Sequence, residues 1–366
     1  MGRRSRFFDG KVDEINLSND LKKKRKQFMS QLVEPIDLKT AESITALIDG
    51  WQKTSIQSRS IALAAKTYEN MLADKARPTI FLGLSGALIA GGLREVIRDL
   101  IDFGLVDVIV STGAILYQDY YTSKGYRHYR GSSTAPDDEL LHDVYIDRIY
   151  DSYVDEVGFV KVDDLIAELA EALEPRKYST REFMMILGKS ISDPKSILYT
   201  AAKKGVPIFC PAVADSSIGI GLTGLYRWCK KQGKACLTLD TIRDNYEIAQ
   251  IVLKSKKTAA IYVGGGVPKN YINDACVMLD YTKGHSYAFQ ITTDSPHWGG
   301  LTGSTLDEAK SWGKVSKKAT RATAYVEATI GLSLISAYVI QKKRWEGRKQ
   351  LKFKWQDDEL KSLQLI

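Results

Sequence analysis

A short apolar run that ends in a turn of small residues decides the fold: Thr79-Ile80-Phe81-Leu82-Gly83-Leu84-Ser85-Gly86-Ala87. Its length and apolar character predict a buried strand. A helix is expected next, with an apolar face made of Leu93, Val96, Ile97, Leu100 and Ile101. A second apolar run, residues 106–110, ends in another small-residue loop, residues 111–114. This is a βαβ unit, which predicts a parallel sheet with its ligand loops at the carboxyl ends of the strands.

The same pattern recurs along the chain. Further strands are predicted at residues 206–210, 259–263, 287–291 and 322–326, with residues 237–240 as an additional candidate. Most of these runs are followed by Gly, Ser, Thr, Ala or Asp. The sequence therefore predicts an α/β fold that is Rossmann-like and doubly wound, with a mainly parallel sheet, helices on both faces and a helical N-terminal extension.

Three regions are expected along the chain. Residues 1–38 are a polar, basic N-terminal arm, with a short helix predicted around residues 20–33. Residues 39–340 are predicted to form a single α/β domain that opens with two helices, and residues 341–366 a basic C-terminal tail.

The segment between the second and third strands is less regular. The acidic residues 137–139 are expected to open a helical stretch that runs toward Tyr150. Two more helices are predicted near residues 162–173 and 180–192.

Composition excludes several classes of protein. The net charge of +8 is concentrated at the two ends of the chain, and no nucleic-acid motif accompanies it, so nucleic-acid binding is not expected. No apolar run is long enough to cross a bilayer and no signal peptide is recognisable, so a cytoplasmic protein without a membrane contact is expected. The four cysteines lack metal-ligand spacing, so neither a disulfide framework nor a metal site is predicted.

Small residues after a strand let backbone N–H groups approach a phosphate closely. Several such loops at one edge of a sheet favour a ligand of nucleotide size. The G-x-G-x-x-G fingerprint is absent from the first loop, so the pattern of an ordinary dehydrogenase does not fit.

A second informative stretch lies late in the chain: Leu306-Asp307-Glu308-Ala309-Lys310-Ser311-Trp312-Gly313-Lys314. It brings an acid, an indole and a lysine close together, as a nucleophilic lysine requires. The alternative interpretation is a helix N-terminus, because Thr305 and Glu308 have the spacing of a capping box.

Five groups of residues resemble the deoxyhypusine synthase family, in that family's order and spacing. They are Phe81–Ser85 with Gly92–Glu95, Val106–Thr112, Pro207–Ala212, Gly264–Lys269, and Glu308–Ala309 with Ser311–Lys314. The resemblance covers residues 78–337, and its most specific part is Ser311-Trp312-Gly313-Lys314.

The resemblance implies an NAD-dependent transfer of an aminobutyl group from spermidine through an imine on a lysine. By position, Lys314 matches that lysine, while Trp312, Glu308 and Asn270 match substrate-binding positions. The implied cofactor-binding residues are Ser85, Gly86, Thr112, Gly113, Asp215, Gly264, Gly265, Gly266, Thr292, Thr293, Glu327 and Ala328. Glu327 stands where the family has a ribose-binding aspartate. The family also implies a homotetramer with active sites shared between paired subunits.

The chain departs from the family at several polyamine-binding acids. Two glutamates expected after residue 112 are absent, Ile220 and Leu301 stand in place of aspartates, and Asn270 replaces a histidine. Burying a polyamine without carboxylate partners is costly, so the donor or its pose should differ. The candidate replacements are Asp119, Asp137, Asp138 and Asp294.

The sequence is compatible with four functions. The favoured one transfers the group to putrescine or another small amine, and the next modifies a lysine of translation initiation factor 5A. The others are a different NAD-dependent dehydrogenase and a catalytically inactive binding protein.

Overall fold

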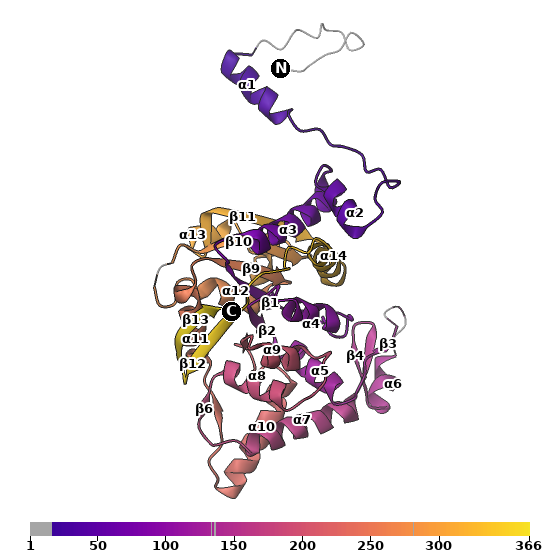
Figure 1. The fold of residues 1–366 in the computed structure, drawn as a ribbon. Coiled ribbons are helices and arrows are strands. Elements are labelled where there is room, and N and C mark those ends of the chain that lie inside the picture. The colour runs from indigo at the N-terminus through magenta and orange to yellow at the C-terminus, as the bar shows by residue number, and fades with distance from the viewer. Residues whose placement is uncertain (1–16, 133, 135–136, 281) are drawn as a thin grey trace.

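Residues 17–132, 134, 137–280 and 282–366 are described by a computed structural model of the chain (Figure 1). Its central element is a six-stranded sheet with the order β11-β10-β9-β1-β2-β7, and every pairing in it is parallel. The strands are β1 (Thr79–Leu84), β2 (Val108–Ser111), β7 (Ile208–Phe209), β9 (Thr258–Val263), β10 (His285–Thr292) and β11 (Val315–Tyr325). The six main predicted runs all lie in this sheet, which confirms the mainly parallel α/β fold.

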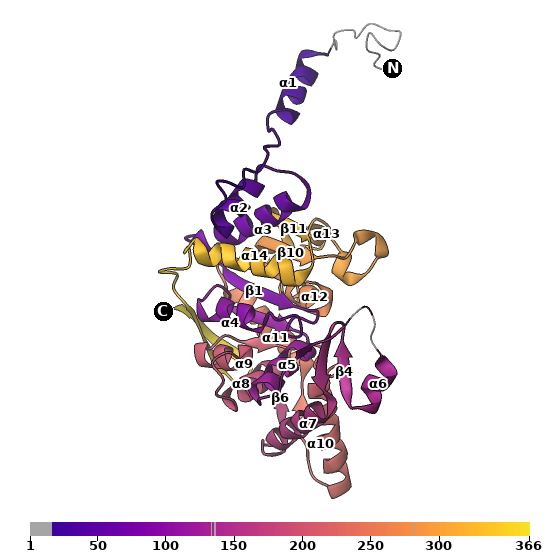
Figure 2. The same ribbon diagram turned by 90° about the vertical axis from the view of Figure 1, so that its right-hand side faces the viewer.

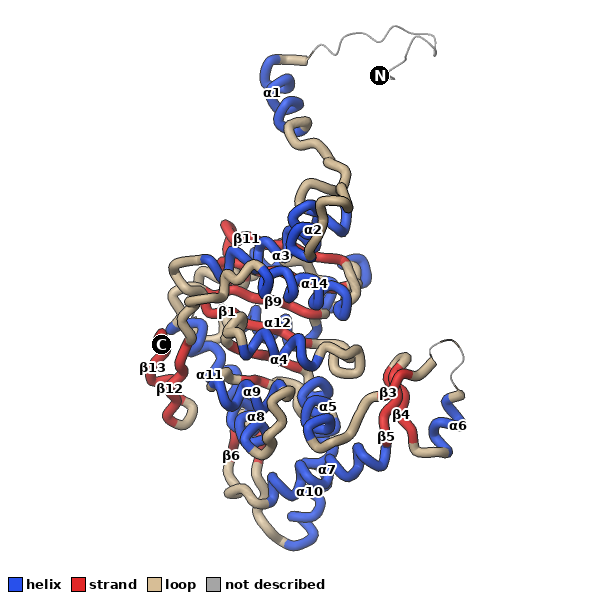
Figure 3. Tube along the Cα trace, turned by 45° about the vertical axis from the view of Figure 1, so that its right-hand side comes forward, coloured by secondary structure: helices blue, strands red, loops and turns tan. Residues whose placement is uncertain are grey.

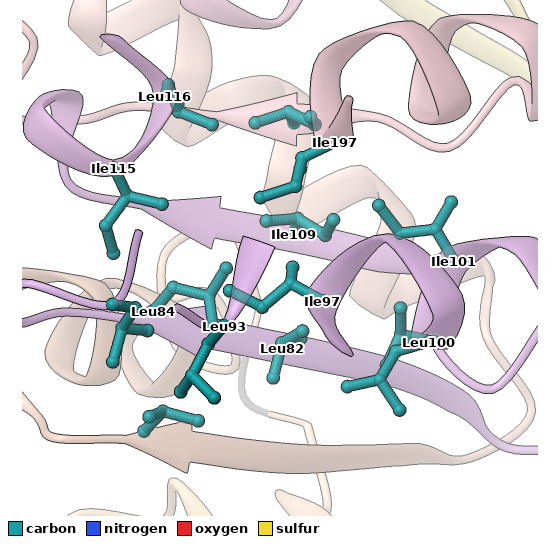
Figure 4. Close-up of a cluster of buried hydrophobic side chains, with 14 of the residues drawn as sticks. Leu82, Leu84, Leu93, Ile97, Leu100, Ile101, Ile109, Ile115, Leu116 and Ile197 are labelled. Atoms are coloured by element: carbon teal, nitrogen blue, oxygen red, sulfur yellow. The ribbon is translucent and has the colours of Figure 1, made fainter. Parts of the chain in front are cut away.

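The sheet is buried on both faces. Leu82 and Leu84 of β1 belong to one apolar cluster and Phe81 to another, because successive side chains of a strand point to opposite faces. Figure 4 shows Leu82 beside Ile97 and Leu100 of the following helix, and Leu84 beside Leu93. Helices on one face of the sheet contribute side chains to the first cluster: α3 (Ile56–Ala73), α4 (Arg94–Asp102), α5 (Gly113–Ser123), α9 (Ile197–Lys204) and α14 (Ala328–Gln341). Helices on the other face contribute side chains to the second cluster: α11 (Thr241–Lys254) and α12 (Gly266–Asp274).

The order of the strands creates a crevice. From β1 the chain passes to β2 and β7 on one side, and it then returns to the other side of β1 to form β9, β10 and β11. The loops that follow β1 and β9 therefore run in opposite directions. A reversal of this kind leaves room for a ligand at the carboxyl edge of the sheet.

The N-terminal arm projects away from the rest of the chain (Figure 1, Figure 2). Its helix is α1 (Asn19–Phe28), which is capped by Ser18 and has no buried residue. The predicted helical extension is present as α2 (Ile44–Trp51) and α3. Residues 1–16, which were also assigned to the arm, lie outside the described residues.

The helical stretch predicted from residue 137 toward Tyr150 is largely wrong. Only α6 (Asp138–Asp143) is helical, and β4 (Ile146–Ile149) and β5 (Ser152–Asp155) follow it. They pair with β3 (Tyr129–Arg130) in a separate antiparallel sheet (Figure 3). The chain turns between β4 and β5 at Tyr150, which has a positive φ of 57° and cannot continue a helix.

The two helices predicted near residues 162–173 and 180–192 are present as α7 (Glu156–Glu171) and α8 (Thr180–Lys189). A further helix, α10 (Ser217–Gln232), was not predicted. The candidate strand at residues 237–240 is β8 (Thr238–Leu239), which pairs with β6 (Lys177–Tyr178) outside the central sheet. None of the helices among the described residues has the length and apolar character needed to cross a membrane.

The segment predicted as a basic tail contains a β-hairpin. It is formed by β12 (Leu351–Gln356) and β13 (Glu359–Leu365), and it lies beside α11 (Figure 1). Lysines alternate with Phe353 and Trp355 along β12, and these two aromatic side chains pack against the second apolar cluster. Lys352 and Lys354 therefore lie on the outer face of β12, because side chains alternate between the two faces of a strand.

Candidate active site

A cavity of about 800 Å³ lies at the carboxyl edge of the sheet. Its walls come mainly from the loops that follow β1, β9, β10 and β11. The predicted cofactor residues among its lining are Ser85, Gly86, Gly264, Thr292, Thr293, Glu327 and Ala328. These residues are far apart in sequence, and the parallel sheet brings them together because each follows the end of a strand or is its last residue.

Another wall of the cavity was not predicted. It is the turn between β4 and β5, residues 149–152, which adds the exposed carboxylate of Asp151. The hydroxyl of Ser152 donates a hydrogen bond to the carbonyl of Ala90 at 3.1 Å and so ties the turn to the loop after β1. Nothing in the sequence indicated where this hairpin would lie.

Five predicted cofactor residues do not line the cavity. Gly265 and Gly266 adjoin Gly264, which does line it, whereas the other three lie farther along the same edge: Thr112 and Gly113 follow β2, and Asp215 precedes α10. Gly113 lies so close to Ser216 that a Cβ atom at this position would be 2.3 Å from the Ser216 hydroxyl. Only glycine permits this contact between the loops after β2 and β7.

The backbone N–H groups of the three glycines after β9 donate hydrogen bonds to other parts of the protein. The N–H groups of Gly264, Gly265 and Gly266 donate to the Ile291 carbonyl (2.8 Å), the Ser85 hydroxyl (2.9 Å) and the Thr302 hydroxyl (3.0 Å). A Cβ atom on Gly265 would lie 2.7 Å from Cα of Thr302. These glycines therefore allow three loops to meet, and their N–H groups are already paired instead of being directed at a phosphate.

Glu327 begins α14 beside the cavity. Its carboxylate accepts from the N–H groups of Thr329 at 2.8 Å and Ile330 at 3.3 Å. Burial opposes ionisation, but the hydrogen bonds from Thr329 and Ile330 outweigh it and lower the pKa of Glu327. The side chain is therefore a carboxylate at neutral pH.

Lys269 is a buried residue of this region that was not predicted to belong to the site. Its side chain lies on α12, and its ammonium group donates to Gln290 Oε1 (3.0 Å) and to the carbonyls of Thr302 (3.1 Å) and Ser304 (2.5 Å). Burial lowers the pKa of Lys269 to about 8. The lysine thus holds the loop that carries η1 (Pro296–Trp298) and η2 (Leu301–Gly303) against α12.

Lys314, which directly precedes β11, forms a separate centre with side chains of α12. Its Nζ atom lies 2.6 Å from Oδ1 of Asp274, 3.4 Å from Oδ1 of Asn270 and 5.3 Å from the centre of the Trp312 ring. Asn270 also donates to Oδ2 of Asp274 at 2.8 Å. The predicted Lys314, Trp312 and Asn270 are therefore together, whereas Asp274, the carboxylate in direct contact, was not predicted.

Glu308 has a different place from the one expected. It begins α13 (Glu308–Ser311), is exposed, and its N–H donates to the Thr305 hydroxyl at 3.0 Å. Its negative charge, with that of Asp294, acts on Lys269 and favours the ammonium form there. The helix-start interpretation of this stretch and the lysine interpretation are thus compatible.

Three of the four candidate polyamine acids have structural partners. Asp119 is fully buried and binds Arg94 at 2.7 Å and the first residues of α9, Asp137 caps α6, and Asp138 binds Arg148. Asp294 is the one of the four that lines the cavity.

The cavity and Lys314 are not joined within one chain. The carbonyl of Lys314 accepts from the N–H of His285, which starts β10, whereas Thr292 at the other end of β10 lines the cavity. The seven steps along β10 from His285 to Thr292, at about 3.3 Å each, place the Lys314 backbone roughly 23 Å from the cavity edge. None of Lys314, Trp312, Asn270 and Asp274 is among the described residues that line the cavity.

The fold and the site define an α/β protein with a ligand cavity at the carboxyl edge of its sheet and a separate lysine–carboxylate pair. The chain belongs to the deoxyhypusine synthase family, whose model matches residues 46–339. It is 44% identical over 333 residues to "Probable deoxyhypusine synthase 2" of Methanosarcina mazei, covering 89% of this chain and 94% of that protein. It is also 40% identical over 351 residues to "Deoxyhypusine synthase-like protein" of Elusimicrobium minutum, covering 92% of each.

A solved structure has the same fold. The crystal structure of "a putative deoxyhypusine synthase from Entamoeba histolytica" is similar with a TM-score of 0.60 and 20% identity, covering 89% of this chain and all of that one. At this identity the similarity concerns the fold alone.

Proposed function

We propose that the chain is an NAD-dependent transferase that moves an aminobutyl group from a polyamine such as spermidine, through an imine on Lys314, to putrescine or another small amine. The observation that carries the proposal is the 2.6 Å contact between Lys314 Nζ and Asp274 Oδ1. An amine attacks only after it loses its proton, and a carboxylate in contact with it can accept that proton.

The capture step uses residues of this chain. With its proton on Asp274, Lys314 attacks the imine carbon of the oxidised donor, and that carbon then carries both nitrogens. The two hydrogens left on Nζ pass to the propylamine nitrogen as its bonds to the carbon break, and the carbon becomes the imine carbon of Lys314. The departing amine also takes up the proton held by Asp274 and leaves as an ammonium ion, so no net charge is created. The exposed indole of Trp312 offers an aromatic face beside the reacting nitrogen, which suits a cationic substrate.

The residues of the carboxyl-edge cavity fit NAD. Small side chains follow the strands, α14 begins there, and the carboxylates of Glu327 and Asp151 can accept hydrogen bonds from ribose hydroxyls. NAD bound there would supply the acceptor and later the donor of hydride. We assign the finer description of the fold, a Rossmann-like doubly wound sheet, on the same grounds.

The proposal includes assembly into a homotetramer. Hydride transfer requires contact between donor and cofactor, so the cavity of one copy must meet Lys314 of another. Three exposed apolar side chains support such a contact: Trp312 beside the lysine, and Trp298 and Leu301 on the loop that reaches the cavity through Thr302. They are 63%, 77% and 45% exposed. The cytoplasmic location included in the proposal rests on the family.

The test combines trapping with a choice of acceptor. The protein is incubated with NAD and spermidine, treated with borohydride and digested, and the expected result is a butylamine-derived mass on the peptide that contains Lys314. Lys314→Ala should lose the tag and retain NAD binding, whereas Lys317→Ala, at an exposed lysine nearby, should keep both.

Each acceptor then gives a different result. Product with putrescine supports the small-amine enzyme, and modification of added translation initiation factor 5A supports the protein-modifying alternative. NAD reduction without a tag would indicate a dehydrogenase, and NAD binding without turnover would indicate a binding protein. Either of these last two results contradicts the proposed transfer.

A further inference from the structure

His285 lies at the amino end of β10, behind the lysine centre, and is fully buried. Its Nδ1 atom is 2.9 Å from the hydroxyl of Thr258 on β9, and its Nε2 atom is 3.3 Å from the carbonyl of Ile272 on α12. A carbonyl can only accept, so Nε2 carries the proton and Nδ1 accepts from Thr258. The ring therefore joins β9, β10 and α12.

The backbone of the same residue holds Lys314. The N–H of His285 donates to the Lys314 carbonyl at 3.0 Å, and the Lys314 N–H donates to the Ala309 carbonyl at 3.0 Å. Gly284 precedes His285 with a φ of 69°, and a Cβ atom there would lie 2.7 Å from the Gly313 carbonyl oxygen. The backbone of Lys314 is thus packed directly against residues 284 and 285.

The ring contact reaches the partner of the lysine. Ile272, whose carbonyl accepts from the ring, lies in the last turn of α12, and that turn ends at Asp274. Cys276 lies just beyond it, with Sγ 3.5 Å from Nε2 of the same ring. One residue therefore contacts both the Lys314 backbone and the helix end that carries Asp274.

We propose that His285 is a positioning residue that keeps Lys314 and Asp274 in contact, which rests on the proposed role of Lys314 in amine transfer. Without the ring, the end of α12 loses an anchor while Lys314 stays tied to β10. The two reacting groups then move independently. A displacement of about 1 Å at a reacting centre can lower a rate about 100-fold.

His285 does not itself take part in the chemistry. Burial lowers the pKa of His285 to about 4 and raises the pKa of the Cys276 thiol to about 12. Both side chains are therefore neutral at pH 7, so they do not form a thiolate–imidazolium pair. The ring acts through its two hydrogen bonds.

The test compares His285→Leu, which removes both ring hydrogen bonds, with His285→Gln, whose amide can still donate to the Ile272 carbonyl. In full-length protein we expect His285→Leu to lower kcat for spermidine about 30-fold, with less than a threefold change in the KM for spermidine and in the Kd for NAD. His285→Gln should recover most of kcat. Tyr338→Phe removes buried hydrogen bonds to Asp49 and Glu69 on the opposite face and should lower Tm without changing kcat.

Two results would overturn the inference. One is a wild-type kcat in His285→Leu, and the other is a loss of kcat that His285→Gln does not relieve. A probe that needs neither NAD nor polyamine separates this inference from the proposed function: pyridoxal with borohydride labels Lys314 by direct imine formation. Slower labelling in His285→Leu, with recovery in His285→Gln, would support positioning even if polyamine transfer were absent. Equal labelling in all three proteins would contradict it.

Discussion

Lys314 and Asp274 form a short ion pair between the segment that precedes β11 and the last turn of α12, with 2.6 Å between Nζ and Oδ1. The two side chains are 15% and 32% exposed, so solvent screens their attraction. Pairs of this kind contribute about 1 kcal/mol or less to stability. The contact therefore contributes little to holding the fold, and in the proposed function its role is proton transfer.

Asp274→Asn separates these two roles. We expect the single-turnover rate of Lys314 tagging to fall about 100-fold, because the amide cannot accept the proton. The unfolding free energy should change by less than about 1 kcal/mol. Asp102→Asn provides a control, since Asp102 forms a comparable exposed pair with Lys204 at 3.0 Å. An unchanged tagging rate in Asp274→Asn would exclude Asp274 as the base.

Trp312→Ala tests the aromatic face beside the lysine. Because the indole is 63% exposed, its loss should leave Tm nearly unchanged. Loss of a cation–π contact worth about 0.5–1 kcal/mol should raise the KM for spermidine about two- to fivefold. Steady-state kinetics measure this KM, and the KM of Trp312→Phe should lie between those of the wild type and Trp312→Ala. A large fall in Tm with an unchanged KM would mean that the indole has a structural role.

The sequence indicated the cavity better than the lysine centre, for a physical reason. Ser85, Gly264 and Thr293 directly follow strands, and parallel strands gather their carboxyl ends at one edge, so a correct topology places such residues together. Asp274 meets Lys314 only because α12 and the segment before β11 pack side by side. No local pattern encodes that contact.

The C-terminal hairpin was missed because charge was given more weight than alternation. The period of two in Lys352-Phe353-Lys354-Trp355 is typical of a half-buried strand, and this signal was present in the sequence. The turn at Tyr150 is different, since a positive φ at tyrosine is not expected from sequence.

Lys269→Met should destabilise the cavity. Methionine has a similar length but leaves Gln290 Oε1 and the carbonyls of Thr302 and Ser304 without their donor, which costs about 2–4 kcal/mol. NAD should bind more weakly because Thr302 lines the cavity. Denaturant unfolding and a fluorescence titration with NAD measure the two effects. Lys318→Met, at an exposed position, should change neither the free energy of unfolding nor the affinity for NAD.

Stability should depend on pH through His285. Its pKa is about 4 in the folded chain because of burial, whereas an unfolded histidine has a pKa of about 6.5. Between these values the unfolded state binds more protons, so His285 makes the unfolding free energy fall as the pH is lowered from 6.5 toward 4. Urea unfolding at several pH values should show a weaker dependence for His285→Phe than for the wild type. His297→Ala, at an exposed histidine, should retain the wild-type slope.

Leu360→Ala tests whether the C-terminal hairpin is part of the core. Leu360 is 1% exposed and belongs to the same apolar cluster as Ile248 and Ile251 of α11. Its N–H also donates to Gln250 Oε1 at 2.9 Å. Truncating a buried leucine leaves a cavity, so we expect a loss of about 2–4 kcal/mol in the unfolding free energy.

Leu365→Ala is the matched control, because Leu365 lies on the same strand and is 46% exposed. This change should cost less than about 0.5 kcal/mol. Both free energies come from denaturant titrations of the full chain. If the two variants unfolded at the same denaturant concentration as the wild type, the hairpin would be a tail that contributes nothing to the fold. A single cooperative transition shifted only in Leu360→Ala would instead mean that the last strand folds together with α11.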